Sequence, residues 1–389
     1  MSRWEVTENL PEYHGPIGPV TSRVALVPGE EVEVQLAFGV PKEIKDHFIR
    51  GDVVWWPKHP HNQDSTVPHA SAPTADLADI FPTASRTSSY LLGPQNRAVG
   101  LKLPTTHTQP GVRSEGKERM HADLKGGLVR SEYVRAQSQK FPDAELIVLR
   151  ELMAFTDKKT GNGFMVRDLE PLQDGNYYLP GFSVPSLGES IAVKQGESGD
   201  AFWSEHYAAS LGRAKAKLLV RYGLQMKTPN AQNWLVQMNA EGKPTGAIVV
   251  RDINDANFVG PIAEAMGHQK RLEMERTFGW EEDTKLQPRG SFSFWRFNEG
   301  PSAMSPKTIQ SFLDSHDRAY LQTINELLGL SIPLPPPTLV PRPYLSKTGS
   351  PETQSDSYLQ ESQAVKDAET VLLSPEGLEA IRRYHQVNP

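Results

Sequence analysis

The sequence predicts an α+β protein, with a β-rich first half and a second half in which a β-hairpin lies between amphipathic helices. Between Ser85 and about Pro185, short apolar runs alternate with turns, as in RAVGLKL, AELIVLRELMAF and FMVRDLEPL. Apolar runs of this length between turn residues are typical of strands. From Gly199 onwards, apolar residues recur at helical spacing, as in DAFWSEHYAASLGRAKAKLLVRYGL, which ends on a glycine at a C-cap position.

The hairpin is predicted for NWLVQMNAEGKPTGAIVVRD, which reads as a strand, a glycine-containing turn and a second strand. Two amphipathic helices are expected after it, in PIAEAMGHQKRLEMERTFGW and KTIQSFLDSHDRAYLQTINELLGL. Near the N-terminus, VALVPGEEVEVQLAF predicts two short strands, and the residues from 41 to 84 are rich in loop formers. The chain is therefore divided into a lead-in and loop-rich segment (1–80), a β-rich segment (81–198), a hairpin-and-helix segment (199–332), a proline-rich and polar linker (333–357) and a C-terminal helical segment (358–389).

The composition excludes several classes of function. The 389 residues include no cysteine, so disulfide frameworks, thiolate zinc sites and cysteine nucleophiles are ruled out. The net charge of −6 comes from 41 basic and 47 acidic residues without a clustered basic face, so no nucleic-acid partner is expected. No run approaches the ~18–20 apolar residues of a membrane span, and the first residues lack the pattern of a signal peptide. We expect a cytoplasmic protein with no membrane partner.

A candidate metal site lies at the open end of the predicted hairpin. Asn233 begins the first strand and Asp252 follows the second, so pairing of the strands brings the two residues together. An amide oxygen and a carboxylate are hard ligands that suit Mg²⁺, which takes the rest of its shell from water and substrate phosphates. The alternative is that both residues are polar caps of an ordinary hairpin.

A candidate phosphate site lies in the β-rich segment. The turn Ser85-Arg86-Thr87 offers a guanidinium and two hydroxyls, and Lys102 and Arg113 follow on the next strand and turn. Such groups bind phosphate oxygens through charge-assisted hydrogen bonds. The alternative is a set of exposed basic side chains with no ligand.

Taken in order, these pieces resemble the NRPS-independent siderophore synthetases of the aerobactin-synthetase type. The resemblance covers about residues 80 to 280 and rests on PTASRT (82–87), LKLPTTHTQPGVR (101–113), MVRDLEP (165–171), RYGL (221–224), NAQNWLV (230–236) and VVRD (249–252). It implies a β-rich fingers lobe and a kinase-like palm lobe, with ATP and Mg²⁺ as cofactors. It also implies a ligase that joins a small carboxylic acid to an amine or alcohol through an acyl-adenylate.

The resemblance also implies roles for individual residues. Arg86, Lys102, Arg113 and Asn230 would be catalytic, and Asn233 and Asp252 would hold the metal. The nucleotide would be bound by Ser85, Arg86, Thr87, Lys102, Arg113, Arg167, Gln232, Asn233 and Asp252.

Three departures from the family pattern leave the substrates open. Asn230 stands where the family has a histidine associated with the carboxylate substrate, and Thr228 stands where it usually has an acidic residue. Ser85 and Arg86 lack the residue that separates them in the family. Two alternative functions therefore remain, a small-molecule phosphotransferase and a non-catalytic nucleotide-binding partner protein. A homodimer is also possible. His59, His61 and His107 are either remnants of a substrate loop or exposed loop residues, and Glu205 and His206 lie on a predicted helix with no assigned role.

Overall fold

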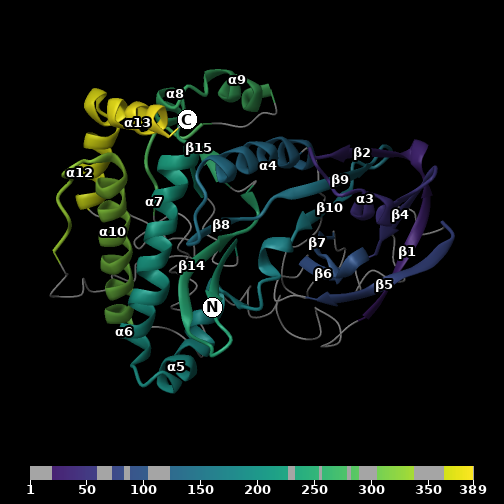
Figure 1. Ribbon diagram of the computed structural model, residues 1–389, viewed down its shortest axis with the longest axis horizontal. Coiled ribbons are helices and arrows are strands. Elements are labelled where there is room, and N and C mark those ends of the chain that lie inside the picture. The colour runs from purple at the N-terminus through teal and green to yellow at the C-terminus, as the bar shows by residue number, and fades with distance from the viewer. Residues whose placement is uncertain are drawn as a thin grey trace, which may run out of the picture. The chain divides into compact units, whose positions relative to one another are not determined.

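The computed structural model describes residues 20–58, 72–82, 88–103, 123–226, 233–253, 256–277, 282–288, 305–336 and 363–388. These residues form two compact units (Figure 1). The sheet unit contains the described residues of 4–135 and 149–174, and the helical unit contains those of 136–148 and 175–389. The division differs from the predicted segments because the strands of the N-terminal segment join the same sheet as the strands of the β-rich segment.

The sheet unit is built on one nine-stranded sheet in the order β2-β9-β10-β7-β6-β5-β1-β4-β3. Its strands are β1 (Val20–Pro28), β2 (Val32–Leu36), β3 (Ile49–Arg50), β4 (Val53–Pro57), β5 (Thr74–Pro82), β6 (Ser88–Leu92), β7 (Ala98–Lys102), β9 (Glu151–Asp157) and β10 (Gly163–Asp168). Every pairing between them is antiparallel. A long apolar face results, because alternate residues of each strand point to the same side.

The main core of the sheet unit lies on one face of this sheet. It includes Phe155 and Phe164, whose rings stack with centroids 4.3 Å apart, and Trp56, which meets Phe164 edge-on at 5.0 Å. The helix α3 (Lys42–Phe48) contributes Phe48 to the same cluster. The opposite face carries a smaller cluster in which Leu128 of α4 (Asp123–Lys140) packs with Ala154 and Met165.

The helical unit contains a four-stranded sheet, β11-β13-β14-β8, and a two-stranded sheet, β12-β15. The strands are β8 (Leu146–Val148), β11 (Tyr177–Pro180), β12 (Leu224–Met226), β13 (Trp234–Met238), β14 (Pro244–Val250) and β15 (Ala256–Phe258). β13 and β14 form the predicted hairpin, and β8 pairs with β14 in parallel. All five residues of β13 are buried, as expected for an inner strand.

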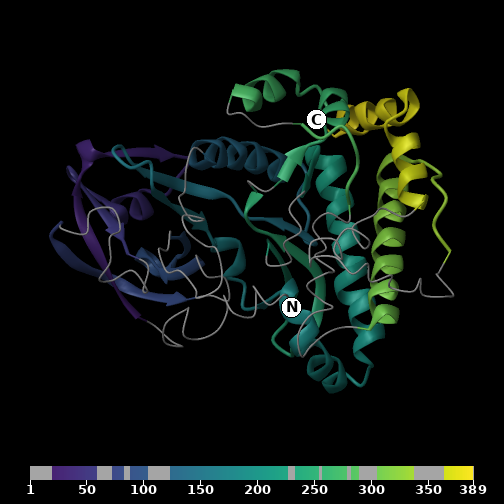
Figure 2. The same ribbon diagram turned by 180° about the vertical axis from the view of Figure 1, so that it is seen from behind.

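The described helices of this unit are α5 (Val184–Lys194), α6 (Gly199–Trp203), a π-helical stretch (Ser204–Ala209), α7 (Ser210–Tyr222), α8 (Gly260–Ala265), α9 (Gln269–Thr277), α10 (Pro306–Leu328), α12 (Gln363–Leu372) and α13 (Pro375–Val387). Five of them, α7, α8, α10, α12 and α13, share one apolar core among the described residues, and α7 and α10 run side by side in both views (Figures 1 and 2). α7 ends at Gly223, whose φ of 65° is the left-handed conformation of a glycine C-cap.

The predicted fold class is confirmed, and several local predictions are corrected. The residues read as loop-rich, 41 to 84, contain α3, β3, β4 and β5, and the β-rich segment contains α4 and α5. The single helix expected in PIAEAMGHQKRLEMERTFGW is two helices, α8 and α9, because the chain turns at Gly267 with a φ of 83°. None of the helices in the described part of the chain is long and apolar enough to cross a bilayer.

Candidate functional site

In the sheet unit, Lys102 and Arg167 project from the same face of the nine-stranded sheet. Lys102 of β7 lies opposite Met165 of β10, and Gly100 of β7 lies opposite Arg167 of β10. The two cross-strand pairs are two residues apart along each strand. Because positions two apart share a face, both basic side chains point to the side on which α4 packs. Two of the predicted phosphate-binding groups, separated by 65 positions in sequence, therefore share one surface.

Arg167 is held in place by a buried carboxylate. Its Nε and Nη2 donate hydrogen bonds to the same oxygen, Oε1 of Glu151, at 3.0 and 2.6 Å. The side chain of Glu151 is 0% exposed and that of Arg167 is 7% exposed. Charge-assisted hydrogen bonds of this kind fix the plane of a guanidinium.

In the helical unit, Asn233 and Asp252 flank the open end of the hairpin, as the sequence predicts. Trp234 pairs with Val250, and the amide of Arg251 donates to the carbonyl of Asn233 at 3.0 Å. Asn233 is 2% exposed, and Asp252 adopts a left-handed backbone with a φ of 64°. Asp and Asn tolerate this conformation better than other residues with a side chain, so the position itself favours an oxygen-bearing side chain.

The donor set at this end of the hairpin fits a hard divalent cation. One amide oxygen and one carboxylate match a Mg²⁺ ion that keeps several waters and binds substrate phosphates. No cluster of three or more histidine, aspartate or glutamate side chains occurs within the described ranges, so an ion held entirely by such side chains has no site there.

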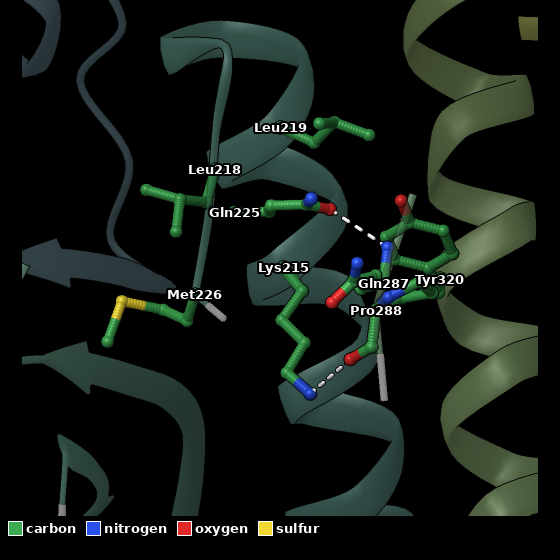
Figure 3. A pocket seen from close by; sticks show the side chains of 8 residues that line it. All are labelled: Lys215, Leu218, Leu219, Gln225, Met226, Gln287, Pro288 and Tyr320. Atoms are coloured by element: carbon green, nitrogen blue, oxygen red, sulfur yellow. Dashed lines mark hydrogen bonds between the residues drawn. The ribbon is translucent and has the colours of Figure 1, made fainter. Parts of the chain in front are cut away.

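A small recess in the helical unit is lined by residues of α7, β12, α10 and the 282–288 segment (Figure 3). Its volume of about 10 Å³ is room for about one water molecule. Lys215 of α7 lines it, donates to the carbonyl of Pro288 at 2.5 Å and lies 5.7 Å from the centre of the Trp234 ring. Gln225 accepts from the amide of Gln287 at 3.0 Å (Figure 3). These contacts tie the 282–288 segment to α7 and β12, and the recess is too small for a nucleotide.

The remaining predicted site residues lie outside the part of the chain that the structure describes. They are Ser85, Arg86, Thr87, Arg113, Asn230 and Gln232, together with His59, His61, His107 and Thr228. Glu205 and His206 lie in the π-helical stretch, where Glu205 is exposed and pairs with Arg213 at 3.4 Å. The ring of His206 lies 4.5 Å from that of Phe202. Both have local partners that account for their positions.

Sequence reasoning missed Glu151 and Lys215. The signal for Glu151 was present, because it is the only charged residue in the apolar run ELMAF, and a charge inside a buried strand requires a partner. Lys215 gave no such signal, since it lies in a helix with several basic residues, most of which would be expected at the surface.

Comparison with known proteins identifies the class of fold. No family model matches the chain, and no curated protein matches it by sequence. Among solved structures, its fold is that of the NRPS-independent siderophore synthetases, in agreement with the resemblance seen in the sequence.

Three such structures share between 12% and 15% identity with this chain. Aerobactin synthetase IucC from a hypervirulent pathotype of Klebsiella pneumoniae has a TM-score of 0.55 at 13% identity, over 84% of this chain and 65% of its own. ATP-bound aerobactin synthetase IucA from the same pathotype has a TM-score of 0.54 at 15% identity, over 84% and 67%. The petrobactin biosynthesis protein AsbB from Bacillus anthracis str. Sterne has a TM-score of 0.51 at 12% identity, over 97% and 71%. At these identities the similarity establishes the fold, and this chain spans about two thirds of the length of those proteins.

Proposed function

We propose that this protein is an ATP- and Mg²⁺-dependent ligase that joins a small carboxylic acid to an amine or alcohol through an acyl-adenylate. The observation that carries the proposal is the position of Asn233 and Asp252 at one end of the hairpin, in a fold shared with a synthetase solved with ATP bound. Lys102 and Arg167, which share one face of the nine-stranded sheet, would supply positive charge for phosphate oxygens.

The proposed reaction has two steps. A carboxylate oxygen of the acid attacks the α-phosphorus of ATP, and the bond between that phosphorus and the pyrophosphate oxygen breaks. The lone pair of the amine or alcohol then attacks the acyl carbon, the carbon–oxygen bond to AMP breaks, and the proton of the acceptor passes to solvent. Negative charge grows on phosphate oxygens in the first step, so cationic side chains held close to those oxygens lower its barrier.

In this reaction the residues of the chain bind and orient rather than transfer protons. Lys102 and Arg167 would hold phosphate oxygens, and Asn233 and Asp252 would orient the metal-bound phosphates. A bound Mg²⁺ would neutralise part of the charge of the leaving pyrophosphate. Correct placement of two substrates can supply several kcal/mol of the barrier reduction, on the order of 7–11 kcal/mol in favourable cases.

The products of ATP turnover test the proposal. The protein is incubated with ATP, Mg²⁺ and a panel of carboxylic acids and amines, with citrate and other dicarboxylates first, and the nucleotide products are separated. AMP with pyrophosphate supports the ligase. ADP would instead show a phosphotransferase, and binding of ATP without any turnover on the panel would favour the non-catalytic partner protein.

Asp252→Asn provides the matched variant for this assay. Asparagine keeps the size and tolerates the left-handed backbone at this position, so the fold is preserved while the carboxylate is lost. We expect turnover to fall and the Mg²⁺ concentration needed for half-maximal rate to rise. An unchanged dependence on Mg²⁺ would remove Asp252 from the metal site.

A further inference from the structure

The pair formed by Glu151 and Arg167 depends on an irregularity in the sheet. Along β9 and β10 the register runs Met165 to Ala154 and Val166 to Met153, and it then shifts so that Arg167 lies opposite Glu151. The extra residue on β9 is Leu152. Without this bulge, Arg167 would lie opposite Leu152, and Glu151 would point to the other face of the sheet. Bulges often re-aim a side chain beside a functional site.

Other contacts fix the bulge from both sides. The amide of Glu151 donates to Oγ of Ser131 on α4 at 2.7 Å, and the amide of Ala37 on the neighbouring segment donates to the carbonyl of Leu152 at 2.9 Å. On the far side of Arg167, a Cβ atom on Gly100 would lie 3.3 Å from the Cβ of Arg167, tighter than most real contacts. The stem of Arg167 is thus confined between Gly100 on β7 and the carboxylate on β9.

Among the described residues, Arg167 donates both of the hydrogen bonds that the Glu151 carboxylate accepts. Oε1 accepts both hydrogen bonds, and Oε2 is buried and has no hydrogen-bond partner in the described part of the chain. A buried ion pair with an unsatisfied oxygen stabilises a fold poorly, because an apolar pair of similar volume often serves as well or better. Stability alone therefore does not account for a charged residue at this position.

We propose that Glu151 is a positioning residue that orients Arg167 towards a phosphate oxygen of the bound nucleotide. Glu151 takes the Nε–Nη2 edge of the guanidinium, so the edge that contains Nη1 is directed away from β9. A guanidinium whose plane and direction are fixed loses less entropy when it binds an oxyanion than one that rotates. This inference rests on the proposed function, because it assumes that Arg167 binds phosphate.

A double-mutant cycle on nucleotide binding tests the proposal. Glu151→Gln keeps the shape and removes the charge, and Arg167→Lys keeps the charge and removes the planar fork. The affinity of the full-length protein for ATP is measured by calorimetry for both single variants and the double variant, with melting temperatures recorded in parallel. Glu33→Gln on β2 is the matched control, because it removes a carboxylate from the same sheet at a position opposite Thr156, five residues along β9 from Glu151.

If Glu151 acts through Arg167, Glu151→Gln weakens ATP binding about tenfold, with the effect on KM rather than kcat. Once Arg167 is lysine, the same substitution changes the affinity by less than about twofold. Glu33→Gln leaves the affinity unchanged. Where Glu151→Gln does not fold, Glu151→Asp replaces it, since the shorter side chain keeps the charge but no longer reaches both donors, and the same non-additivity is expected.

The outcomes separate this inference from the proposed function. Equal effects of Glu151→Gln in the presence and absence of Arg167, or a lower melting temperature with unchanged ATP affinity, would show a structural role and overturn the inference. If Arg167→Lys bound ATP as tightly as the wild type, the inference about Glu151 would be overturned. The proposed ligase activity would still be tested separately, by the products of ATP turnover. No ATP binding by the wild-type protein would contradict both.

Discussion

α7 and α10 approach each other closely at Gly212, so the loss of stability caused by a larger residue there can be worked out from the structure. A Cβ atom on Gly212 would lie 2.3 Å from the carbonyl oxygen of His316 and 3.1 Å from the amide nitrogen of Tyr320. Both are backbone atoms in the middle of α10, so no side chain can rotate to make room. Gly212→Ala would force the helices apart by roughly 0.7 Å or more at this point in a closely packed interior.

The expected change in stability is the difference between two effects. Alanine favours a helix over glycine by about 1 kcal/mol. Overpacking in a well-packed core costs about 1–3 kcal/mol, and contact with rigid backbone belongs at the upper end or beyond. We therefore expect Gly212→Ala to lower the free energy of unfolding by about 2 kcal/mol, which corresponds to a fall in Tm of about 4–8 °C.

Thermal and urea denaturation followed by circular dichroism measure this change. Arg213→Ala is the control, because it alters the next residue of α7, whose side chain is partly exposed, and should change stability by no more than about 0.5 kcal/mol. A Tm for Gly212→Ala equal to or above that of the wild type would refute the close helix contact, since only the gain in helix propensity would then remain.

Three further predictions concern charge. Burial alone would raise the pKa of the Asp143 carboxyl, but hydrogen bonds from Lys217 and from the amide of Glu145, with the positive charges of Lys217 and Arg221, hold the pKa below its usual value. Asp143→Asn should therefore cost about 2–4 kcal/mol at neutral pH. Urea titrations should show the difference shrinking as the pH falls below about 4, because the carboxyl of the unfolded chain is protonated there before that of the folded protein. Burial is the main cause, and nearby positive charges the second, that lower the pKa of His268 to about 4. As the pH falls, His268 is therefore protonated in the unfolded chain before it is protonated in the folded protein. Stability should fall by about 1–3 kcal/mol as the pH drops from about 6.5 to 4, and His268→Gln should flatten that slope; an NMR titration of the imidazole with a pKa near 6.5 would contradict this. Asp252→Asn should leave Tm within about 1 °C of the wild type, because asparagine accepts the backbone conformation at that position, and a larger fall would indicate a structural role.

The elements that the sequence predicted well are those with strong periodicity and clear ends. The helix that ends at Gly223 has regularly spaced apolar residues and a glycine C-cap, and the hairpin has two apolar strands around a glycine turn. Because a hairpin brings its open ends together, the positions of Asn233 and Asp252 followed directly from the strand assignment.

Two elements, α4 and β4, were not predicted from the sequence, and each has a physical reason. α4 contains two glycines and buries Arg130, Ser131 and Gln137, so its buried face is not an apolar stripe and gives no helical period. β4 ends in proline within a segment rich in loop formers, and its buried residues, such as Trp56, are covered by residues that are distant in the sequence, such as Phe164. Tertiary packing, rather than local preference, decides such segments.

The candidate site was predictable only in part. Lys102 and Arg167 were predicted to bind phosphate, and that role stays a prediction, but their shared face depends on the antiparallel register of β7 and β10, which the sequence does not specify. The Glu151–Arg167 pair depends on a shift of a single residue at the bulge. A one-residue change of register moves a side chain to the opposite face, so such a pair is visible only once the sheet is known.

The fate of oxygen in the acid substrate tests the acyl-adenylate most directly. A carboxylic acid that supports turnover is labelled with oxygen-18 in its carboxylate, and the products of a reaction with ATP, Mg²⁺ and the acceptor are analysed by phosphorus NMR and mass spectrometry. Because the carboxylate oxygen that attacks the α-phosphorus leaves with AMP, the account predicts one labelled oxygen in AMP and none in pyrophosphate. Label in inorganic phosphate together with ADP, or AMP that carries no label, would contradict it.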